Sequence, residues 1–337
     1  MSAPSKTNIV KTYIGRFAPS PTGPLHLGSL ITAFASYIDA KANNGLWFIR
    51  IEDLDPPREP PKAADEILNQ LQLLGLEWDG EVLYQSTRST FYQEVLDLLI
   101  ERGLCFACDC TRTQVKAMGA VYDGSCRKRT LPPENEFAIR LETESIEIGF
   151  EDVIQGHFQQ SIRKEVGDFI ILRKDKLFAY QLAVVVDDAF QGITNIIRGF
   201  DLLDSTPRQI YQQRLLGYAT PLYGHVPVIV DKRGLKLSKQ NFAEPVNAYD
   251  SSELIHLTLQ LLGQCPPNNN QSKELSANRF GDGSNYKMRI FREFFKIAGI
   301  ENSRLKHGIK RECFGMPLAT NFREYLTLKD KKLIDLE

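Results

Sequence analysis

The chain has 337 residues, which suits two structural units better than one minimal domain or three. Its composition of 42% hydrophobic and 25% charged residues excludes a disordered, collagen-like or disulfide-dense protein. Its 41 Lys and Arg residues nearly balance 42 Asp and Glu residues, which argues against coating nucleic acid by bulk charge but allows a local basic face.

The longest apolar runs, such as residues 182–186, are too short to cross a bilayer, and the first ten residues lack the apolar run of a secretory signal. We therefore expect a cytoplasmic protein with no membrane partner. Four of the six cysteines crowd into residues 105–126, which is more typical of a metal site in a reducing compartment than of a disulfide framework.

The first predicted elements alternate strand, helix and strand. Residues 9–17 are apolar and β-branched, as in a strand, and lead into the breaker-rich loop APSPTGPLHLGS. A helix is expected from Leu27 or Gly28, because apolar residues then recur at helical spacing. After a turn at residues 43–45, LWFIRIEDLD predicts a buried strand with acidic residues at its carboxyl end. This order predicts an α/β fold with a doubly wound parallel sheet.

Further along the chain, helical periodicity returns at residues 63–74 and 92–102, and residues 137–178 have the pattern of short strands and turns. The apolar run YQLAVVVDDAF, residues 180–190, predicts a second buried strand that ends in acidic residues. Residues 206–216 predict a helix of the returning half of the sheet.

The predicted elements divide the chain into four regions. We expect the first half of a catalytic domain at 1–101, an insertion at 102–178, the second half at 179–241 and a smaller, mainly helical region at 242–337.

The segment RFAPSPTGPLHLGS, residues 16–29, joins the first strand to the first helix. Gly23 and Gly28 allow close backbone approach, and His26 falls at a helix start, where N–H groups and the helix dipole favour phosphate. An H-x-G triplet alone is usually an ordinary strand-to-helix turn. The whole segment, however, closely resembles the first signature of class I aminoacyl-tRNA synthetases, in their glutamate-activating branch. The resemblance implies a Rossmann-type fold in which His26 stabilises the phosphates of ATP.

The segment KLSKQ, residues 236–240, follows the apolar run VPVIV. A short Lys/Ser segment by itself is usually a solvated loop. In this order along the chain, it resembles the second signature of the same class. The resemblance implies that Lys239 stabilises the transition state at the α-phosphate of ATP.

Three more stretches resemble the glutamate pocket of this branch. The resemblance implies that Glu52, in IEDLD, holds the amino group of the amino acid, and that Tyr180 and Arg198 close round it. Arg16 and Arg198 carry planar guanidinium groups, which suit carboxylates better than lysine does. The implied site comprises catalytic His26 and Lys239; glutamate-binding Arg16, Ala18, Ser20, Glu52, Tyr180 and Arg198; and, for ATP with Mg²⁺, Pro19, Gly23, His26, Gly28, Ser29, Lys236, Ser238 and Lys239.

The cysteine-rich stretch has the sequence CFACDC at 105–110 and YDGSC at 122–126. This spacing is typical of a structural zinc site, with one ion per chain. The simplest ligand set is Cys105, Cys108, Cys110 and Cys126, and the alternative without metal is a group of free buried thiols.

The family resemblance implies a different ligand set. Zinc-carrying glutamyl-tRNA synthetases continue with a histidine soon after the last cysteine, whereas this chain continues with the basic run 127–129. A shorter paralogous family, the glutamyl-Q tRNA(Asp) synthetases, uses a tyrosine, which implies the ligands Cys108, Cys110, Tyr122 and Cys126 and leaves Cys105 out. We expect the basic run to contact RNA phosphates, although such a run is as often a solvated face.

The resemblance covers residues 13–241. Full-length glutamyl-tRNA synthetases continue with a large helical anticodon-binding domain, for which the fewer than 100 residues after Gln240 are too few. The glutamyl-Q family ends at this point, activates glutamate without tRNA and transfers it to queuosine in the anticodon loop of tRNA(Asp). We expect this reaction here, in a monomer whose partners are L-glutamate, ATP and queuosine-bearing tRNA(Asp).

Two alternatives stay open on the sequence alone. One is a truncated glutamyl-tRNA synthetase that charges the acceptor end of tRNA, and the other is an inactive RNA-binding paralogue. Residues from about 265 onward resemble nothing in the family, and no function is assigned to them.

Overall fold

The computed structural model describes residues 12–119, 121–129 and 131–227, together with 254–255, 258–259 and 262. Within these residues, no helix is both long and apolar enough to span a membrane. The first sheet contains the parallel strands β1 (Ile14–Phe17), β2 (Leu46–Ile51) and β3 (Leu83–Tyr84), in that order. Helix α1 (Leu27–Ala42) connects β1 to β2, as predicted.

Helix α1 packs on this sheet, and nearly every residue from Leu30 to Ala40 is buried. Trp47 of β2 is fully buried beneath it and donates from Nε1 to Ser36 Oγ at 3.0 Å, while Tyr37 meets the indole edge to face at 5.0 Å. Leu254 and Leu259, within the mainly helical region predicted at 242–337, join the same core. Burial of this large apolar surface fixes α1, and with it the loop that precedes it, against the sheet.

The second half of the fold continues from β1 into a second sheet with the strand order β7-β6-β10-β9. Its strands are β6 (Glu147–Asp152), β7 (Gly156–Ser161), β9 (Asn195–Gly199) and β10 (Leu222–Val226). Strand β9 runs parallel to β10 and lies against β1, where Thr194 N donates to Ile14 O at 2.9 Å. The β6–β7 hairpin falls within residues 102–178, so this stretch contributes directly to the sheet that carries β9 and β10.

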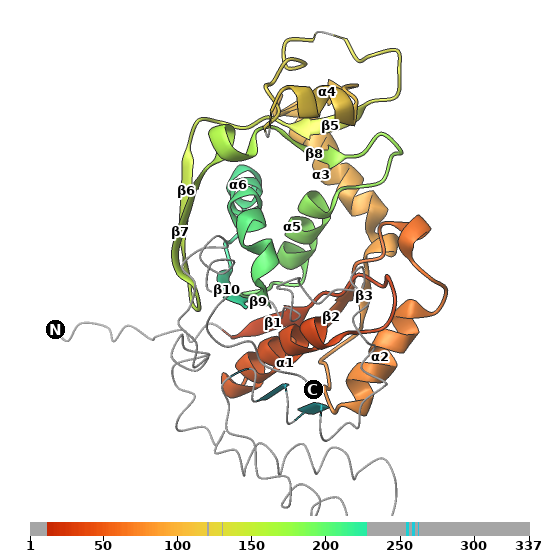
Figure 1. Cartoon of the computed structure of the whole chain (residues 1–337), viewed down its shortest axis with the longest axis vertical. Coiled ribbons are helices and arrows are strands. Elements are labelled where there is room, and N and C mark those ends of the chain that lie inside the picture. The colour runs from red at the N-terminus through yellow and green to blue at the C-terminus, as the bar shows by residue number, and fades with distance from the viewer. Residues whose placement is uncertain are drawn as a thin grey trace, which may run out of the picture.

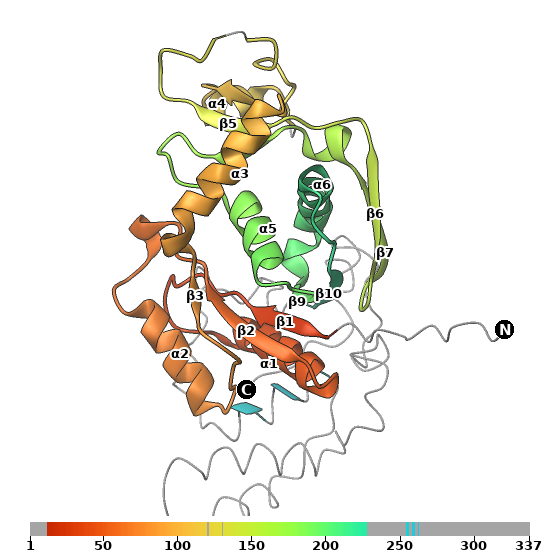
Figure 2. The same ribbon diagram turned by 180° about the vertical axis from the view of Figure 1, so that it is seen from behind.

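Residues 180–190, predicted as a strand, form helix α5 (Tyr180–Phe190), so this prediction was wrong. Every residue from Leu182 to Asp188 is buried. A helix covered on all sides has no polar face, and its apolar run then has the same pattern as a buried strand. Helix α6 (Thr206–Leu216) matches its predicted bounds and packs beside α5, and both lie between α3 and the β6–β7 hairpin (Figures 1 and 2).

The remaining elements run from a helix beside α1 to the opposite end of the molecule (Figure 1). Helices α2 (Ala63–Leu73) and α3 (Ser89–Glu101) agree with the predicted helices, although α3 begins three residues earlier than the predicted 92. A small antiparallel sheet, ordered β4-β5-β8, follows and contains β4 (Cys105–Cys108), β5 (Ala138–Leu141) and β8 (Phe169–Leu172). The short helix α4 (Arg112–Ala117) lies above it. Short turns of helix occur at Pro56–Arg58, Gln85–Arg88, Ile162–Val166 and Phe200–Ser205.

Candidate active site and metal centre

The loop between β1 and α1 presents His26 as the N-cap of α1. His26 Nδ1 accepts a hydrogen bond from Ser29 N at 3.2 Å, and Ser29 Oγ accepts one from His26 N at 3.0 Å. Because Nδ1 is an acceptor, the hydrogen-bond pattern assigns the proton of the neutral ring to Nε2, the nitrogen that can donate to a phosphate at the helix N-terminus. Gly23 has a φ of 135°, which favours glycine in this loop.

The same loop is tied to the end of β2. Glu52 N donates to Pro19 O at 3.0 Å, so the residues that follow β1 and β2 meet at the carboxyl edge of the sheet. The loop positions predicted to bind glutamate and ATP, Ala18, Pro19 and Ser20, therefore lie beside the start of IEDLD. The structure brings these two predicted segments together, as expected for ligand binding beyond parallel strands.

A buried ionic cluster joins β1, β2 and α5. Asp188 Oδ1 accepts from Arg50 Nη1 at 2.8 Å and from Arg16 Nε at 3.2 Å, and these three side chains are at most 4% exposed. Burial raises the pKa of Asp188, but the two guanidinium groups outweigh this effect and the pKa lies below its ordinary value. Asp188 thus anchors Arg16, a predicted glutamate ligand, to helix α5.

Glu52 lies at the other side of Arg50, with 3.6 Å between Arg50 Nη2 and Glu52 Oε1. Burial raises the pKa of Glu52 to about 7, although Arg50 and Arg16 favour the ionised form. A buried carboxyl group that titrates near neutral pH is a feature of functional sites. The 3.6 Å to Arg50 is longer than a hydrogen bond, so the ionised form suits a ligand that donates directly and brings a positive charge.

Tyr180 interacts electrostatically with Arg198, Arg16 and Glu52. Burial raises the pKa of Tyr180, while Arg198 and Arg16 lower it and Glu52 raises it further, which places the four groups in one electrostatic neighbourhood. Arg198 is 2% exposed, and among the described residues its Nη1 has no hydrogen-bond partner. Leaving a buried polar group unpaired costs about 1–3 kcal/mol, so Nη1 points to a ligand that supplies an acceptor.

Arg50, Asp188, Asp152 and His225 were not among the predicted site residues. An arginine inside the apolar strand LWFIRI was a signal for a buried ion pair, because a lone charge is rarely buried. Asp188 was noted only as an acidic residue at the end of an apolar run. Nothing in the sequence pairs Asp152 with His225, which are 73 positions apart and meet through Oδ2 and Nδ1 at 2.5 Å.

Of four other residues predicted to bind ATP, the structure describes one, Gly28. Gly28 lies in the first turn of α1, where its carbonyl accepts from Thr32 Oγ1 at 3.2 Å. Lys236, Ser238 and Lys239 lie outside the described residues.

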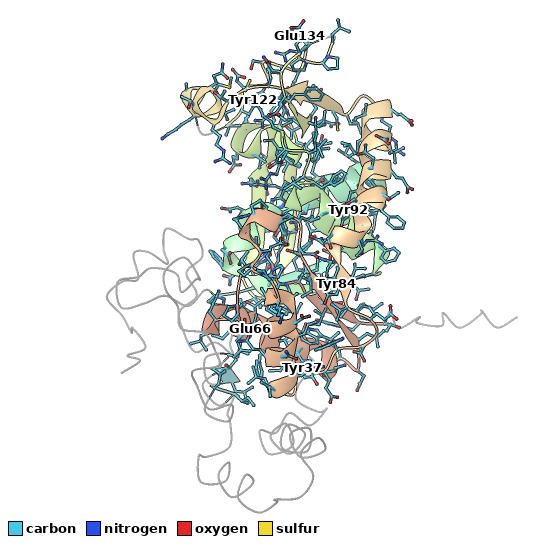
Figure 3. All side chains as sticks on the ribbon, turned by 90° about the vertical axis from the view of Figure 1, so that its right-hand side faces the viewer. Tyr37, Glu66, Tyr84, Tyr92, Tyr122 and Glu134 are labelled. Carbon is cyan, nitrogen blue, oxygen red and sulfur yellow. The ribbon has the colours of Figure 1, made fainter. Side chains whose placement is uncertain are left out.

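The cysteine-rich end of the molecule gathers three thiols. The Sγ atoms of Cys108, Cys110 and Cys126 all lie within 4.8 Å of one another, and those of Cys110 and Cys126 are 3.6 Å apart. Tyr122 Oη is 3.6 Å from Cys108 Sγ and accepts from Cys126 N at 3.0 Å. Figure 3 shows Tyr122 at the far end of the molecule from Tyr37 of α1, so this cluster is remote from the His26 loop.

These distances fit a tetrahedral metal site. With Zn–S distances of about 2.3 Å, the edge between two sulfurs is about 3.8 Å, and an oxygen ligand at about 2.1 Å gives a mixed edge of about 3.6 Å. The 3.6 Å between Cys110 Sγ and Cys126 Sγ is close to the first edge, and the 3.6 Å between Cys108 Sγ and Tyr122 Oη matches the second. Burial and neighbouring thiols raise the pKa of Cys110 to about 11, so a metal ion is what would hold it as a thiolate.

Cys105 points away from this cluster. Successive residues of a strand face opposite sides, and Cys105 packs with the core under α3 and α5, while Cys108 belongs to the thiol cluster. Burial raises the pKa of Cys105 to about 12, which fits a neutral thiol in an apolar setting. The geometry therefore favours the set with Tyr122 over the set of four thiols.

Arg127 does not form the exposed basic face expected of the run 127–129. It pairs with Asp168 through both Nε, at 2.6 Å, and Nη2, and Asp168 is 2% exposed. Arg129 is exposed but lies 3.0 Å from Asp109, so Lys128 is the exposed member of the run that has no ion pair among the described residues. The Arg127–Asp168 pair holds the segment that follows Cys126 against the start of β8.

Comparisons with known proteins agree with this architecture. The sequence matches the family described as "tRNA synthetases class I (E and Q), catalytic domain" over residues 12–265. It is 51% identical over 255 residues to a protein of Ectopseudomonas mendocina named glutamyl-Q tRNA(Asp) synthetase, covering 76% of this chain and 86% of that protein. The protein of the same name from Pseudomonas aeruginosa is 50% identical over 259 residues, covering 77% and 88%.

Two solved structures have the same fold. A glutamate tRNA ligase from Elizabethkingia meningosepticum, solved in complex with its amino acid, has a TM-score of 0.61 at 27% identity, covering 70% of this chain. The match spans about half of that ligase, 54% of its length. A glutamate–tRNA synthetase from Elizabethkingia anophelis has a TM-score of 0.67, covering 85% of this chain and 71% of that one, and at 23% identity it shows the fold alone.

These similarities, together with the His26 loop at the carboxyl edge of the parallel strands, lead to one assignment. The protein is an ATP-dependent ligase of the class I aminoacyl-tRNA synthetases, with glutamate–tRNA ligase-like activity. The chain belongs to the glutamyl-Q tRNA(Asp) synthetase family.

Proposed function

We propose that this protein activates L-glutamate with ATP, without tRNA, and transfers the glutamyl group to queuosine in the anticodon loop of tRNA(Asp). The observation that carries the proposal is the charge pattern beside Tyr180, whose pKa responds to Arg16, Arg198 and Glu52. Glutamate carries two carboxylates and one ammonium group. Two guanidinium groups and one carboxylate complement these three charges.

Glu52 and Arg198 have distinct roles in binding. Ionised Glu52 accepts hydrogen bonds from the substrate ammonium group, and this contact adds a second cation beside Arg50 and further favours the ionised form. The α-carboxylate must face ATP at the N-terminus of α1, because it is the group that reacts. The buried Arg198 Nη1 is therefore available to the side-chain carboxylate.

Activation is an in-line displacement at the α-phosphorus of ATP. One oxygen of the α-carboxylate forms a bond to phosphorus while the bond to the pyrophosphate leaving group breaks, and glutamyl-adenylate results. His26 Nε2 donates to the phosphates as their negative charge grows, and Lys239, with Lys236 and Ser238, would stabilise the same phosphates. These residues position and stabilise, with no covalent step of their own. Magnesium bound with ATP would further neutralise the phosphate oxygens.

Transfer follows at the carbonyl carbon of the adenylate. A hydroxyl of the queuosine cyclopentene ring attacks this carbon and releases its proton to solvent, an ester forms, and AMP leaves with the bonding electrons. A modified base in a single-stranded loop can be presented unstacked to the protein. The names and coverage of the Ectopseudomonas and Pseudomonas relatives support queuosine of tRNA(Asp) as the acceptor.

Zinc at Cys108, Cys110, Tyr122 and Cys126 is proposed as a structural ion. It would tie the end of β4 to the segment that contains Tyr122 and Cys126, a long insertion with little other core of its own. No chemical step passes through it.

Two paired assays test the proposal. Glutamate should stimulate ATP–pyrophosphate exchange in the absence of tRNA, and glutamine should not. Labelled glutamate should then attach to queuosine-containing tRNA(Asp) but not to queuosine-free tRNA(Asp), which is the matched control. Nuclease mapping before and after mild base should place the ester in the anticodon loop. Glutamate on the terminal adenosine would instead identify an acceptor-charging enzyme, and absence of exchange at saturating ATP would identify an inactive paralogue.

A further inference from the structure

Asp152, His225 and Arg198 form a hydrogen-bonded row across three neighbouring strands, β6, β10 and β9 (Figure 1). His225 lies directly opposite Arg198 in the parallel register of β10 and β9. Arg198 Nε donates to His225 Nε2 at 3.0 Å, and His225 Nδ1 lies 2.5 Å from Asp152 Oδ2. All three side chains are buried, so the row is part of the rigid sheet.

The hydrogen-bond pattern fixes the proton of His225. Since Nε2 accepts from Arg198, the neutral ring carries its proton on Nδ1 and donates it to Asp152. Burial lowers the pKa of His225 to about 4, against the opposing effect of Asp152, so the ring is neutral at neutral pH. Asp152 is itself held by the backbone, because its Oδ1 accepts from Ile154 N at 3.0 Å and Gln155 N at 2.8 Å.

The direct partners of Arg198 are neutral. Its Nε bonds to the imidazole, its Nη2 donates to Thr206 Oγ1 at 2.7 Å, and its buried Nη1 has no partner among the described residues. Arg16 differs, because it shares the carboxylate of Asp188 with Arg50. A neutral histidine between Asp152 and Arg198 supplies the orienting hydrogen bond without placing a carboxylate on the guanidinium group.

We propose that Asp152 and His225 are positioning residues that hold Arg198 with Nη1 toward the amino acid and leave its charge for the side-chain carboxylate, thereby setting the preference for glutamate over glutamine. This inference rests on the proposed function, in which Arg198 binds that carboxylate. Asp152 fixes the imidazole tautomer, and the tautomer keeps an acceptor against Arg198 Nε, as in other carboxylate–histidine pairs.

Three variants separate this role from a merely structural one in tRNA-independent ATP–pyrophosphate exchange. His225→Leu removes the acceptor, and Asp152→Asn favours the wrong tautomer, with Nε2–H against the Arg198 N–H. Both should raise the KM for glutamate about tenfold or more and lower the preference over glutamine, while the KM for ATP changes less than about twofold. His225→Gln keeps an acceptor and a donor, and it should restore the glutamate KM to within about threefold of wild type.

A double-mutant cycle with Arg198→Met completes the test. If His225 acts through Arg198, His225→Leu should have no further effect on the glutamate KM in the Arg198→Met background. Should Arg198→Met itself leave this KM unchanged, the assignment of Arg198 in the proposed function is wrong. Suppose that Arg198→Met raises the glutamate KM. If Asp152→Asn and His225→Leu then leave this KM unchanged, or raise the KM for glutamate and the KM for ATP equally, the positioning role is overturned and the proposed function stands. Asp152→Asn and His225→Gln decide the question if His225→Leu does not fold.

Discussion

Replacing Glu52 by Gln should stabilise the fold at pH 8 while weakening glutamate binding. Burial raises the pKa of Glu52 from its ordinary 4.5 to about 7 in the folded protein. Between these values the folded chain retains a proton that the unfolded chain has released, and above pH 7 the folded chain must hold a buried carboxylate. The stabilising effect of the protonated form is therefore complete below about pH 4.5 and is lost as the pH rises through about 7.

The difference between the folded and unfolded pKa values of Glu52 sets the size of the change in unfolding free energy. It corresponds to about 3 kcal/mol of unfolding free energy once the group is ionised in both states. Glutamine has the shape of the acid without its charge. The Glu52→Gln variant should match wild type near pH 4 and exceed its unfolding free energy by up to about 3 kcal/mol at pH 8 and above. Function and stability oppose each other at this residue, as is common in active sites.

Urea unfolding at pH 4, 6 and 8 measures the effect, with Glu94→Gln on the exposed side of α3 as the matched control. The control should stay within about 0.5 kcal/mol of wild type at every pH. In glutamate-dependent exchange, wild-type kcat/KM should rise with pH through about 7, and the variant should have a higher glutamate KM without this rise. A Glu52→Gln variant no more stable than wild type at pH 8 would refute the argument that burial dominates the pKa of this group.

Two further predictions use pairs of variants that separate structure from chemistry. His26→Ala should lose the helix cap, with about 1 kcal/mol of stability, and about 10²–10³ in exchange rate. His26→Asn should recover the stability, because asparagine also caps helices, but should not recover the exchange rate. Equal exchange rates for His26→Asn and wild type would contradict the phosphate role. Cys126→Ser should abolish the binding of one zinc per chain and lower the melting temperature, whereas Cys105→Ala should keep the metal. Metal analysis and thermal unfolding measure these effects. Loss of the metal in Cys105→Ala would instead support the four-thiol site.

The sequence predicted most of the elements before their arrangement was known. Periodicity gave α1 and α6 correctly because each has clear end signals, His26 with Ser29 for one and Thr206-Pro207 followed by Gly217 for the other. Periodicity failed for α5, because burial from Leu182 to Asp188 removed the polar face and no side-chain cap marks its start. Helix α1 is buried as continuously, from Ala33 to Ala40, but the His26 cap identifies it.

Recognisable local segments determined the family, the loop with His26 and the candidate ligands of glutamate and metal. Those segments are specific because several special residues must follow one another closely in the chain. Only the tertiary structure decided which charges meet. Asp188 joins Arg16 across 172 positions, His225 joins Asp152 across 73, and the opposite faces of β4 separate Cys105 from Cys108. Pairings of this kind depend on strand order and register, which a local pattern does not contain, because burial makes an ionic partner necessary but does not specify where along the chain it lies.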